Sequence, residues 1–258
     1  MMNKQTVYDL KPEGNVVYIR VDYNVPHDKE GNILDDRRIR ATIPTIQYLL
    51  NQGAAIVLAS HMGRPKGEYK AELSLRPAAA RLAELLQKEV KFIPDCIGPE
   101  ADQAKEELKP GEIILLENLR FHKEEEKNDP DFAKALVKGC DLAVNDAFGV
   151  SHRTHASIVG VGRLLPMVSG LLLKKEIDFL DGVIEHPERP FAAIIGGAKI
   201  SDKIQGIANL METAGVILIG GGMANTFVAA QGYDMGESLQ DKDRFDLARN
   251  LMKKENDL

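Results

Sequence analysis

The sequence of 258 residues contains no tryptophan and only two cysteines, Cys96 and Cys140. The cysteines lie far apart, and neither belongs to a CxxC pair or to a histidine spacing typical of metal sites, so we expect free, idle thiols. No apolar run approaches the ~20 residues of a membrane-spanning helix. The N-terminal segment MMNKQTVYDLKPEG lacks the apolar core of a secretory signal. These absences predict a cytoplasmic protein without a membrane partner.

The sequence also has fewer basic residues than acidic residues. The chain carries 33 Lys and Arg against 39 Asp and Glu, which gives a formal net charge of −6. This balance argues against a general nucleic-acid-binding protein. A site for an anion must therefore be a local cluster of basic side chains, and the positions of the arginines become informative.

What the sequence does contain is an alternation of short aliphatic runs with longer segments of helical period. This pattern is typical of a parallel sheet covered by helices. The expected strands are residues 16–21, 55–60, 112–117, 142–145, 192–195 and 216–219. The expected helices are residues 39–51, 76–87, 130–138 and 202–212, and Gly53, Gly139 and Gly215 follow three of them as stop signals. The fold class is therefore α/β.

A long amphipathic segment, residues 170–185, follows Pro166 and precedes HPERP. We expect one helix that joins two sheets, although a crossover helix within a single sheet fits the same pattern. The first interpretation divides the chain into a domain of residues 1–170, a joining helix of residues 171–188 and a second domain of residues 189–258. The charged stretches GEYKAELS and FHKEEEKNDP are expected to be loops.

Polar and basic side chains follow four of the expected strands. They are Arg20, Asp22 and Asn24, then His61 and Arg64, then Asn118 and Arg120, and last Asn145, Asp146, His152, Arg153 and His155. Arg37, Arg38 and Arg40 lie where a helix begins and can reach the same edge. In open α/β sheets, ligands bind outside the carboxyl ends of the strands. Each guanidinium can hold a phosphate or carboxylate with two hydrogen bonds, so we expect one site for a small, highly charged anion.

Two alternatives to this anion site stay open. A single surface arginine is usually solvated or ion-paired, and His61 alone fits a hydrogen-bonded turn residue. His152, His155 and Asp146 could instead form a metal site, although their spacing fits no common zinc pattern. The anion site therefore depends on the coincidence of several strand ends.

Two glycine-rich turns follow the fifth and sixth expected strands. The first, GGAKISDK, places Gly196 and Gly197 before Lys199 and Lys203, and the second is GGGMANTF. Such turns let the backbone approach a phosphate, and the following helix N-terminus favours negative charge. Neither turn is a P-loop or a GxGxxG motif, and tight-turn geometry alone can explain each. Together with an anion site in the first half, two such turns favour a phosphoryl-transfer enzyme.

Seven segments, in order, resemble the successive signatures of phosphoglycerate kinases. They are RVDYNVP, DDRRIRA, ASHMGRP, LLENLRF, VNDAFGVSHRTHAS, IIGGAKISDK and IGGGMANTF. The resemblance implies two Rossmann-like parallel-sheet domains joined by a hinge helix. It also implies reversible phosphoryl transfer in glycolysis between 1,3-bisphosphoglycerate and ADP, giving 3-phosphoglycerate and ATP with Mg²⁺. We expect a monomer whose partners are 3-phosphoglycerate or 1,3-bisphosphoglycerate and ATP or ADP.

The resemblance also assigns roles to residues. Those expected to hold the phosphoglycerate are Asp22, Tyr23, Asn24, Arg38, His61, Met62, Gly63, Arg64, Arg120 and Arg153. Those expected at the nucleotide are Lys199, Lys203, Gly220, Gly221 and Gly222. Arg38 and Lys199 are the expected catalytic residues, and Arg38 should face the transferred group. Tyr23 and Met62 stand where the family usually has Phe and Leu, with no change in charge.

The family continues beyond the point where this chain stops. Its further part holds a Trp-containing loop, a ribose-binding glutamate and a GGGD[ST] helix start whose Asp serves Mg²⁺, whereas this chain ends in KKENDL. We therefore expect a partial second domain with exposed apolar sheet edges and no protein ligand for the metal. The chain is then either a kinase or a non-catalytic fragment that binds 3-phosphoglycerate only. At this length we expect binding with little or no turnover, because several contributions of ~10²–10³ in rate each would be lost together.

Overall fold

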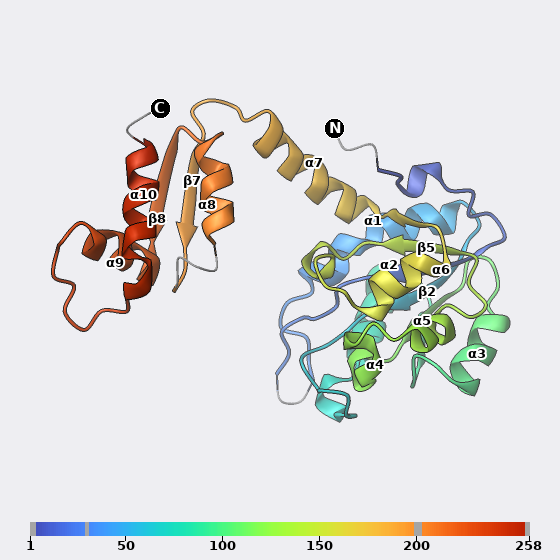
Figure 1. The fold of residues 1–258 in the computed structure, drawn as a ribbon. Helices are drawn as coiled ribbons and strands as arrows, with labels where there is room; N and C mark the ends of the chain where they lie inside the picture. The colour runs from blue at the N-terminus through green and yellow to red at the C-terminus, as the bar shows by residue number, and fades with distance from the viewer. Residues whose placement is uncertain (1–3, 29–30, 199–202, 256–258) are drawn as a thin grey trace. The chain divides into compact units, whose positions relative to one another are not determined.

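The structure, a computed structural model, describes residues 4–28, 31–198 and 203–255. The chain divides into two compact units, Met1–Asp178 and Phe179–Leu258. The division falls inside helix α7 (Leu171–Glu185), in the segment that the sequence predicted as a joining helix (Figure 1). Each unit has its own sheet and its own core, and each is described by itself.

The first unit contains a sheet of six parallel strands. Their order across the sheet is β3 (Lys91–Ile93), β4 (Ile113–Leu116), β2 (Ala55–Ala59), β1 (Val16–Arg20), β5 (Leu142–Asn145) and β6 (Met167–Ser169). The α/β fold class is thereby confirmed, and the four expected strands are β1, β2, β4 and β5. The edge strands β3 and β6 were not expected, because three residues are too few to show a period. Strand β6 lies directly before the long amphipathic segment that was expected to join the two sheets.

Helices flank this sheet in the expected alternation. The α-helices are α1 (Arg37–Asn51), α2 (Arg76–Leu86), α3 (Pro99–Glu106), α4 (Lys123–Glu126), α5 (Pro130–Leu136) and α6 (Val161–Leu164). The short turns of helix are η1 (Val7–Asp9), η2 (Ala71–Leu73), η3 (Leu119–Phe121), η4 (Phe148–Val150) and η5 (Ala156–Gly160). The Asp129 side chain caps α5 by accepting from the N–H groups of Asp131 and Phe132. Gly53, beyond α1, takes a φ of 80°, as a helix stop signal should.

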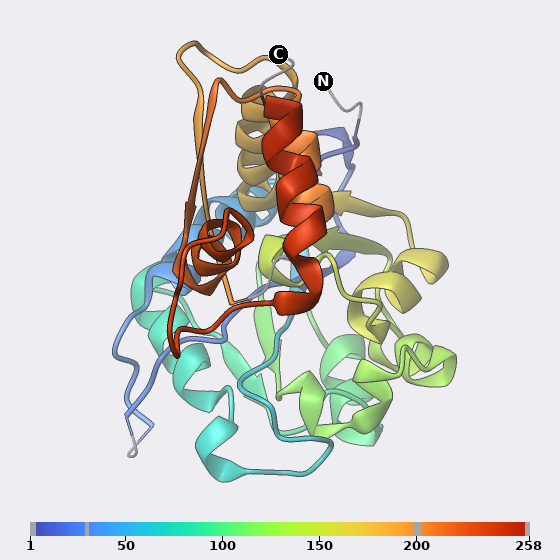
Figure 2. The same ribbon diagram turned by 60° about the vertical axis from the view of Figure 1, so that its left-hand side comes forward.

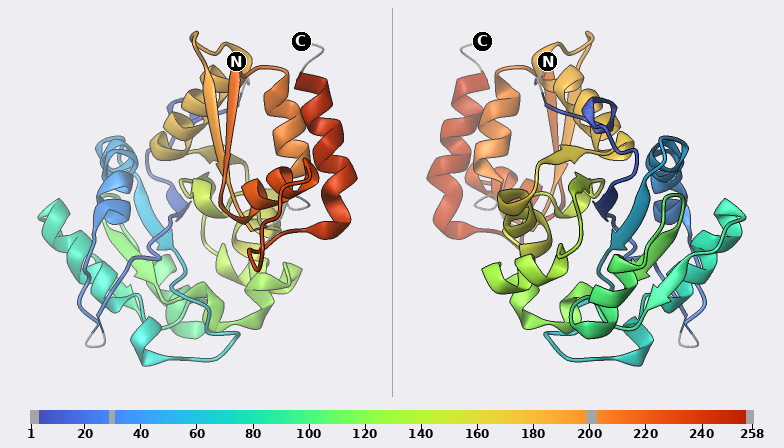
Figure 3. Two further views of the ribbon diagram at one scale, coloured as in Figure 1. Left: turned by 90° about the vertical axis from the view of Figure 1, so that its left-hand side faces the viewer. Right: turned by 90° about the vertical axis from the view of Figure 1, so that its right-hand side faces the viewer.

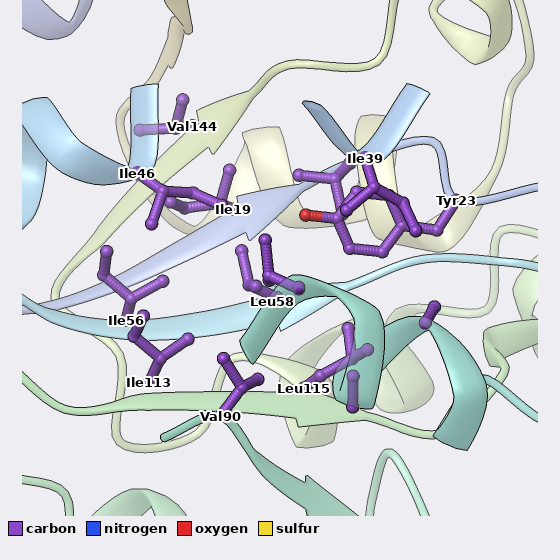
Figure 4. Close-up of a cluster of buried hydrophobic side chains, with 14 of the residues drawn as sticks. Ile19, Tyr23, Ile39, Ile46, Ile56, Leu58, Val90, Ile113, Leu115 and Val144 are labelled. Atoms are coloured by element: carbon purple, nitrogen blue, oxygen red, sulfur yellow. The ribbon is translucent and has the colours of Figure 1, made fainter. Parts of the chain in front are cut away.

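Two apolar clusters cover the two faces of the sheet. On one face, Ile19, Ile56 and Leu58 pack against helices α1 and α2 (Figure 4). On the other face, Tyr18 and Val57 pack against α3, α5 and α6. Because successive residues of a strand point to opposite faces, Tyr18 and Ile19 enter different clusters. Burial on both faces explains why the strands read as continuous apolar runs.

The second unit has a sheet of two parallel strands. They are β7 (Ala192–Gly196) and β8 (Val216–Gly220), and the helices are α8 (Ile204–Met211), α9 (Gly221–Ala230) and α10 (Phe245–Glu255), with a short turn η6 (Lys242–Arg244). Helices α8 and α10 lie on the same side of the two strands (Figure 2 and the left view of Figure 3). On the opposite face Ile194 is 80% exposed, and Val216 and Leu218 are also exposed. The expectation from the sequence concerned exposed apolar edges of this sheet, whereas these side chains expose an apolar face.

Two expectations about surface segments were wrong. The stretches GEYKAELS and FHKEEEKNDP contain the helical turns η2 and α4 rather than loops alone. Within α4, Glu125 is fully buried, because polar partners surround its carboxylate. Among the described residues, no helix combines the length and the apolar character that crossing a membrane requires.

Candidate anion-binding site

The carboxyl ends of four neighbouring strands of the first unit meet at one edge of the sheet. Arg20, the last residue of β1, pairs with Ala59 of β2 on one side and with Asn145 of β5 on the other. The sheet extends from β1 through β2 and β4 in one direction and through β5 in the other. This reversal of strand order beside β1 is where open α/β sheets place their ligands.

Arg38 is oriented by a carboxylate that follows β1. Its Nη1 donates to Oδ2 of Asp22 over 2.6 Å, and the backbone N–H of Asn24 donates to Oδ1 of the same carboxylate over 3.2 Å. The Arg38 side chain remains 53% exposed. Arg38 therefore has a held direction and an exposed guanidinium whose only hydrogen-bond partner among the described residues is Asp22.

The two arginines beside Arg38 are engaged elsewhere. Arg37 pairs with Asp35, and Nε of Arg40 donates to Oδ1 of Asp36 over 2.8 Å. Because a helix turns by 100° per residue, positions 37 and 38 point in different directions. Of the three arginines at this helix start, only Arg38 joins the strand-end residues.

Gly63 ties three strand ends together. Its N–H donates to Oδ1 of Asn24 over 2.9 Å, and its carbonyl accepts from Nη1 of Arg120 over 2.8 Å. Its φ is +61°, and a Cβ there would lie 2.8 Å from Cδ2 of Leu73. Only glycine suits such a position. Gly63 thus uses its backbone groups inside the protein and fixes Asn24 and Arg120.

Two residues expected at the ligand lie in the core instead. Tyr23 is fully buried in the apolar cluster that Figure 4 shows. Its hydroxyl lies 2.9 Å from Oγ1 of Thr42. Met62 packs in the same cluster, and its carbonyl accepts from Nδ2 of Asn118 over 2.8 Å. The side chains of Tyr23 and Met62 therefore pack in the core behind the site. We expected these two side chains to line the site. They do not, because both are buried in the apolar cluster on one face of the sheet.

His61 and Arg20 lie just beneath the surface. Arg20 is buried, and its Nη2 lies 3.2 Å from Nδ1 of His61. Burial, together with the positive charges of Arg20, Arg120 and Arg153 and the neighbouring His155, lowers the pKa of His61 to about 2. His61 is therefore neutral at physiological pH. Arg20, which the sequence placed at the edge, bonds to protein partners there.

Three further arginines supply positive charge at this edge. Arg64 is exposed and forms no ion pair within the described part of the chain. Arg120 is buried, and burial lowers its pKa. The positive charges of Arg153 and Arg20 lower it further. The Nε atoms of Arg120 and Arg153 are buried and lack a hydrogen-bond acceptor among the described residues, although Oε1 of Glu126 lies 3.4 Å from the first. Buried donors of this kind need a partner, and an anion would supply one.

The last strand end is used for structure. Asn145 bonds to Ser151 and to the N–H of Ala147. Asp146 is buried, and its Oδ1 accepts from the N–H groups of Leu172 and Leu173 over 3.0 Å each, at the start of α7. These two residues therefore hold a loop and a helix in place rather than a ligand.

The alternative metal site at His152, His155 and Asp146 does not form. Within the described residues, the one group of metal-ligating side chains within reach of one another is Asp95, Cys96 and His122. Nε2 of His122 lies 2.7 Å from Oδ1 of Asp95, and that contact raises the pKa of His122. Cys96 and Cys140 are both free. The sequence did not indicate that Cys96 and His122 are neighbours, because they lie 26 positions apart in the chain.

In the second unit, the two glycine-rich turns contact each other. A Cβ on Gly221 would lie 3.1 Å from the carbonyl oxygen of Gly197, and the N–H of Met223 donates to that oxygen over 2.9 Å. Gly220 ends β8, and Gly222 approaches the backbone of Ala198 in the same way. This close backbone approach explains the glycines without a ligand. Their place at the nucleotide stays a prediction.

Of the two predicted lysines of the second unit, Lys203 lies within the described residues and Lys199 does not. Nζ of Lys203 donates to the carbonyl of Gly196, at the end of β7, over 2.8 Å. Lys199, one of the two expected catalytic residues, lies outside the described residues. Lys203 is thus at the carboxyl end of a strand, as its motif suggested.

The residues gathered at the edge of the first sheet are named the anion rim from here on. They are Asp22, Asn24, Arg38, His61, Arg64, Arg120 and Arg153. All seven follow the strand ends or belong to the motifs of the sequence, so their place at this edge could be predicted. The burial of Glu125 against Ser157 could not, because a run of three glutamates usually indicates a solvated surface.

Comparisons with known proteins agree with this fold. The family model described as phosphoglycerate kinase matches residues 7–258. The phosphoglycerate kinase of Desulforudis audaxviator is 53% identical over 253 residues, which cover 98% of this chain and 64% of that protein. The phosphoglycerate kinase of Moorella thermoacetica is 54% identical over 251 residues, covering 97% of this chain and 64% of that protein.

A solved structure is similar as well. The phosphoglycerate kinase of Coxiella burnetii matches with a TM-score of 0.85 and 37% identity, and the match covers 98% of this chain and 64% of that one. The chain therefore spans somewhat less than two thirds of the length of these relatives. The family model nevertheless matches nearly all of the chain, and the chain belongs to the phosphoglycerate kinase family.

Proposed function

We propose that the anion rim binds 3-phosphoglycerate or 1,3-bisphosphoglycerate. The observation that carries the proposal is the pair of buried Nε donors on Arg120 and Arg153, which lack acceptors among the described residues. Exposed Arg38 and Arg64 add two guanidinium groups beside them. Four such groups suit a ligand that carries both a carboxylate and a phosphate, because each fork can bind two oxygens.

We further propose that the chain serves the reaction of its family, the reversible transfer of a phosphoryl group between 1,3-bisphosphoglycerate and ADP in glycolysis. Such a reaction depends on positioning and on neutralising charge more than on covalent catalysis. Arg38, held by Asp22, would neutralise charge on the transferred group. Lys199, Lys203 and the turn Gly220 to Gly222 would contact the nucleotide.

Mg²⁺ enters this proposal with the nucleotide and not through a protein site. Mg²⁺ takes hard oxygen ligands and commonly binds through substrate phosphates. The Asp95, Cys96 and His122 group of the first unit offers sulfur and nitrogen besides one carboxylate, so it does not suit this ion. We therefore assign no residue of the described chain to Mg²⁺ and derive no step through it.

Calorimetric titration with 3-phosphoglycerate tests the acceptor site. Each hydrogen bond to a charged group contributes ~1.5–3 kcal/mol, so Arg38→Ala and Arg64→Ala should each weaken binding about 10-fold to 100-fold. Arg37→Ala is the matched control, because Arg37 pairs with Asp35 and should matter little. The affinity should also fall with added salt, because salt screens exposed charges. Binding that ignores both Arg38→Ala and Arg64→Ala would reject the anion site.

A coupled kinase assay on this same chain separates two functions. An active kinase would turn over 1,3-bisphosphoglycerate with ADP, whereas a binding-only protein would show 3-phosphoglycerate affinity without turnover. The binding-only candidate is tested because the match covers only 64% of the length of each of these two relatives. We also propose a cytoplasmic monomer, which fractionation and sedimentation velocity would check.

A further inference from the structure

A buried chain of polar contacts runs behind the anion rim, from helix α4 to His61. Oε1 of Glu125 accepts from the Ser157 hydroxyl over 2.6 Å, and Oε2 accepts from the Ser157 N–H over 2.9 Å. Oγ of Ser157 in turn accepts from Nε of Arg20 over 2.9 Å. Nη2 of Arg20 reaches Nδ1 of His61 at 3.2 Å. All four side chains are buried, so each contact is made in a medium of low dielectric constant.

The contact with Arg20 determines which ring nitrogen of His61 carries the proton. A guanidinium donates hydrogen bonds and never accepts them. Nδ1 of His61 must therefore accept, and an accepting nitrogen has no proton. Oδ1 of Asp22 lies 3.9 Å from Nδ1, which is too far for a competing hydrogen bond. The proton of the neutral ring is then on Nε2.

The charges around His61 keep the ring neutral. Positive groups face it from three elements: Arg20 of β1, Arg120 of η3 and Arg153 after η4, with His155 beside them. The facing negative group is Asp22, at 3.9 Å. Within residues 4–28, 31–198 and 203–255, Nε2 forms no hydrogen bond. The Nε2–H group is therefore an uncharged donor without a protein partner in the described chain.

We propose that Glu125 is a positioning residue for the anion rim. Through Ser157 and Arg20, Glu125 holds His61 in its neutral Nε2–H tautomer. The negative charge of Glu125 balances buried Arg20, and Ser157 fixes the direction of the guanidinium. His61 then offers the ligand one directed N–H donor and no positive charge, while the arginines supply the charge. The role in ligand binding rests on the proposed function. The tautomer itself does not.

Long-range ¹H–¹⁵N NMR of the ¹⁵N-labelled chain without ligand tests the tautomer directly. The signal of His61 is assigned by its loss in His61→Gln, among six histidines. We expect Nδ1 to resonate as an unprotonated nitrogen and Nε2 as a protonated one, unchanged between about pH 5 and 8, the range in which ordinary histidines titrate. A His61 that titrates in this range, or that carries its proton on Nδ1, would overturn the proposal.

Two variants test the role of Glu125. Glu125→Gln removes the charge but keeps the shape, and Ser157→Ala removes the link to Arg20. In each, we expect the two ¹⁵N shifts of His61 to move toward each other as the tautomers mix. Loss of one hydrogen bond of ordinary strength should also weaken 3-phosphoglycerate binding about fivefold. Glu124→Gln, which removes a neighbouring charge from the same helix, is the matched control and should change neither quantity.

The outcomes separate this inference from the proposed function. If Glu125→Gln fails to fold, Ser157→Ala and the wild-type pH series still decide the question. An Nε2–H tautomer in a chain that does not bind 3-phosphoglycerate would reject the proposed function alone. A wild-type tautomer unchanged in both variants would reject the positioning role of Glu125.

Discussion

Gly170 should be one of the positions in the first unit least tolerant of substitution. It immediately precedes α7, and a Cβ there would lie 2.2 Å from Oδ1, 2.3 Å from Cγ and 2.7 Å from Cβ of Asp146. Contacts this short, to three atoms of one buried side chain, cannot be relieved by rotating its end. Gly170→Ala must therefore displace Asp146 from the first turn of α7.

The cost follows from what Asp146 does there. Forcing an extra methyl into a packed site costs ~1–3 kcal/mol. Weakening one of the two N–H bonds from Leu172 and Leu173 to the carboxylate adds ~1.5–3 kcal/mol. The sum, about 2.5–6 kcal/mol, is a large part of the ~5–15 kcal/mol that stabilises an ordinary domain. We therefore expect the first unit of Gly170→Ala to unfold far more easily than that of the wild type.

Urea denaturation followed by near-ultraviolet circular dichroism measures this. All tyrosines except Tyr233 lie in the first unit, and the chain has no tryptophan, so the aromatic signal reports that unit. The midpoint should fall by at least about 1 M urea. Gly162→Ala in α6 is the control within the first unit, because its added Cβ would meet only the Met167 side chain, at 3.8 Å and 3.9 Å, and alanine favours a helix by ~0.5–1 kcal/mol. A loss below about 1 kcal/mol in Gly170→Ala would refute the reasoning.

Two further predictions concern titratable groups. Burial by itself raises the pKa of Glu125, but His155, Arg20 and Ser157 outweigh it and bring the pKa below its usual 4.5. A depressed acid pKa contributes stability that is present above the unfolded value and lost as the pH falls, so the free energy of unfolding of the wild type should drop more steeply below pH 4.5 than that of Glu125→Gln. Equal slopes in acid urea titrations would contradict the assignment. Burial also raises the pKa of Cys96, and raises that of Cys140 to about 12. Ellman's reagent at pH 8 should therefore react with the native thiols about a thousandfold more slowly than with the unfolded chain, and fast native labelling would show that these thiols are accessible.

The positions of the four inner strands of the first sheet and of both strands of the second sheet could be predicted from the sequence. Strands β1, β2, β4 and β5, and both strands of the second unit, lie within a residue or two of their expected bounds. In the first unit the reason is that a parallel strand covered on both faces is apolar throughout, which is a local property of the sequence. Strands β7 and β8 are apolar as well, although one face of their sheet is exposed. The edge strands β3 and β6 have only three residues each, and their pairing partners are chosen in three dimensions.

The anion rim shows the same division. Arg38, Arg64, Arg120 and Arg153 could be found from the sequence, because polar residues after parallel strands must meet at one edge. The sequence could not show whether a side chain lies at the surface of the anion rim or is buried behind it, as Tyr23 and Arg20 illustrate. That depends on which way each side chain leaves the strand end and on what fills the space behind it.

By itself, the sequence determined the α/β fold class, the family signatures and the membership of the anion rim, since these follow from local apolar patterns and from the order of motifs. Only the tertiary structure decided that Glu125 is buried, that Asp146 holds α7 and that His61 is a neutral donor. The physical reason is that burial and hydrogen-bond partners are set by residues far away in the chain. Glu125 meets Ser157, and Arg20 meets His61, only after the sheet and its helices have packed.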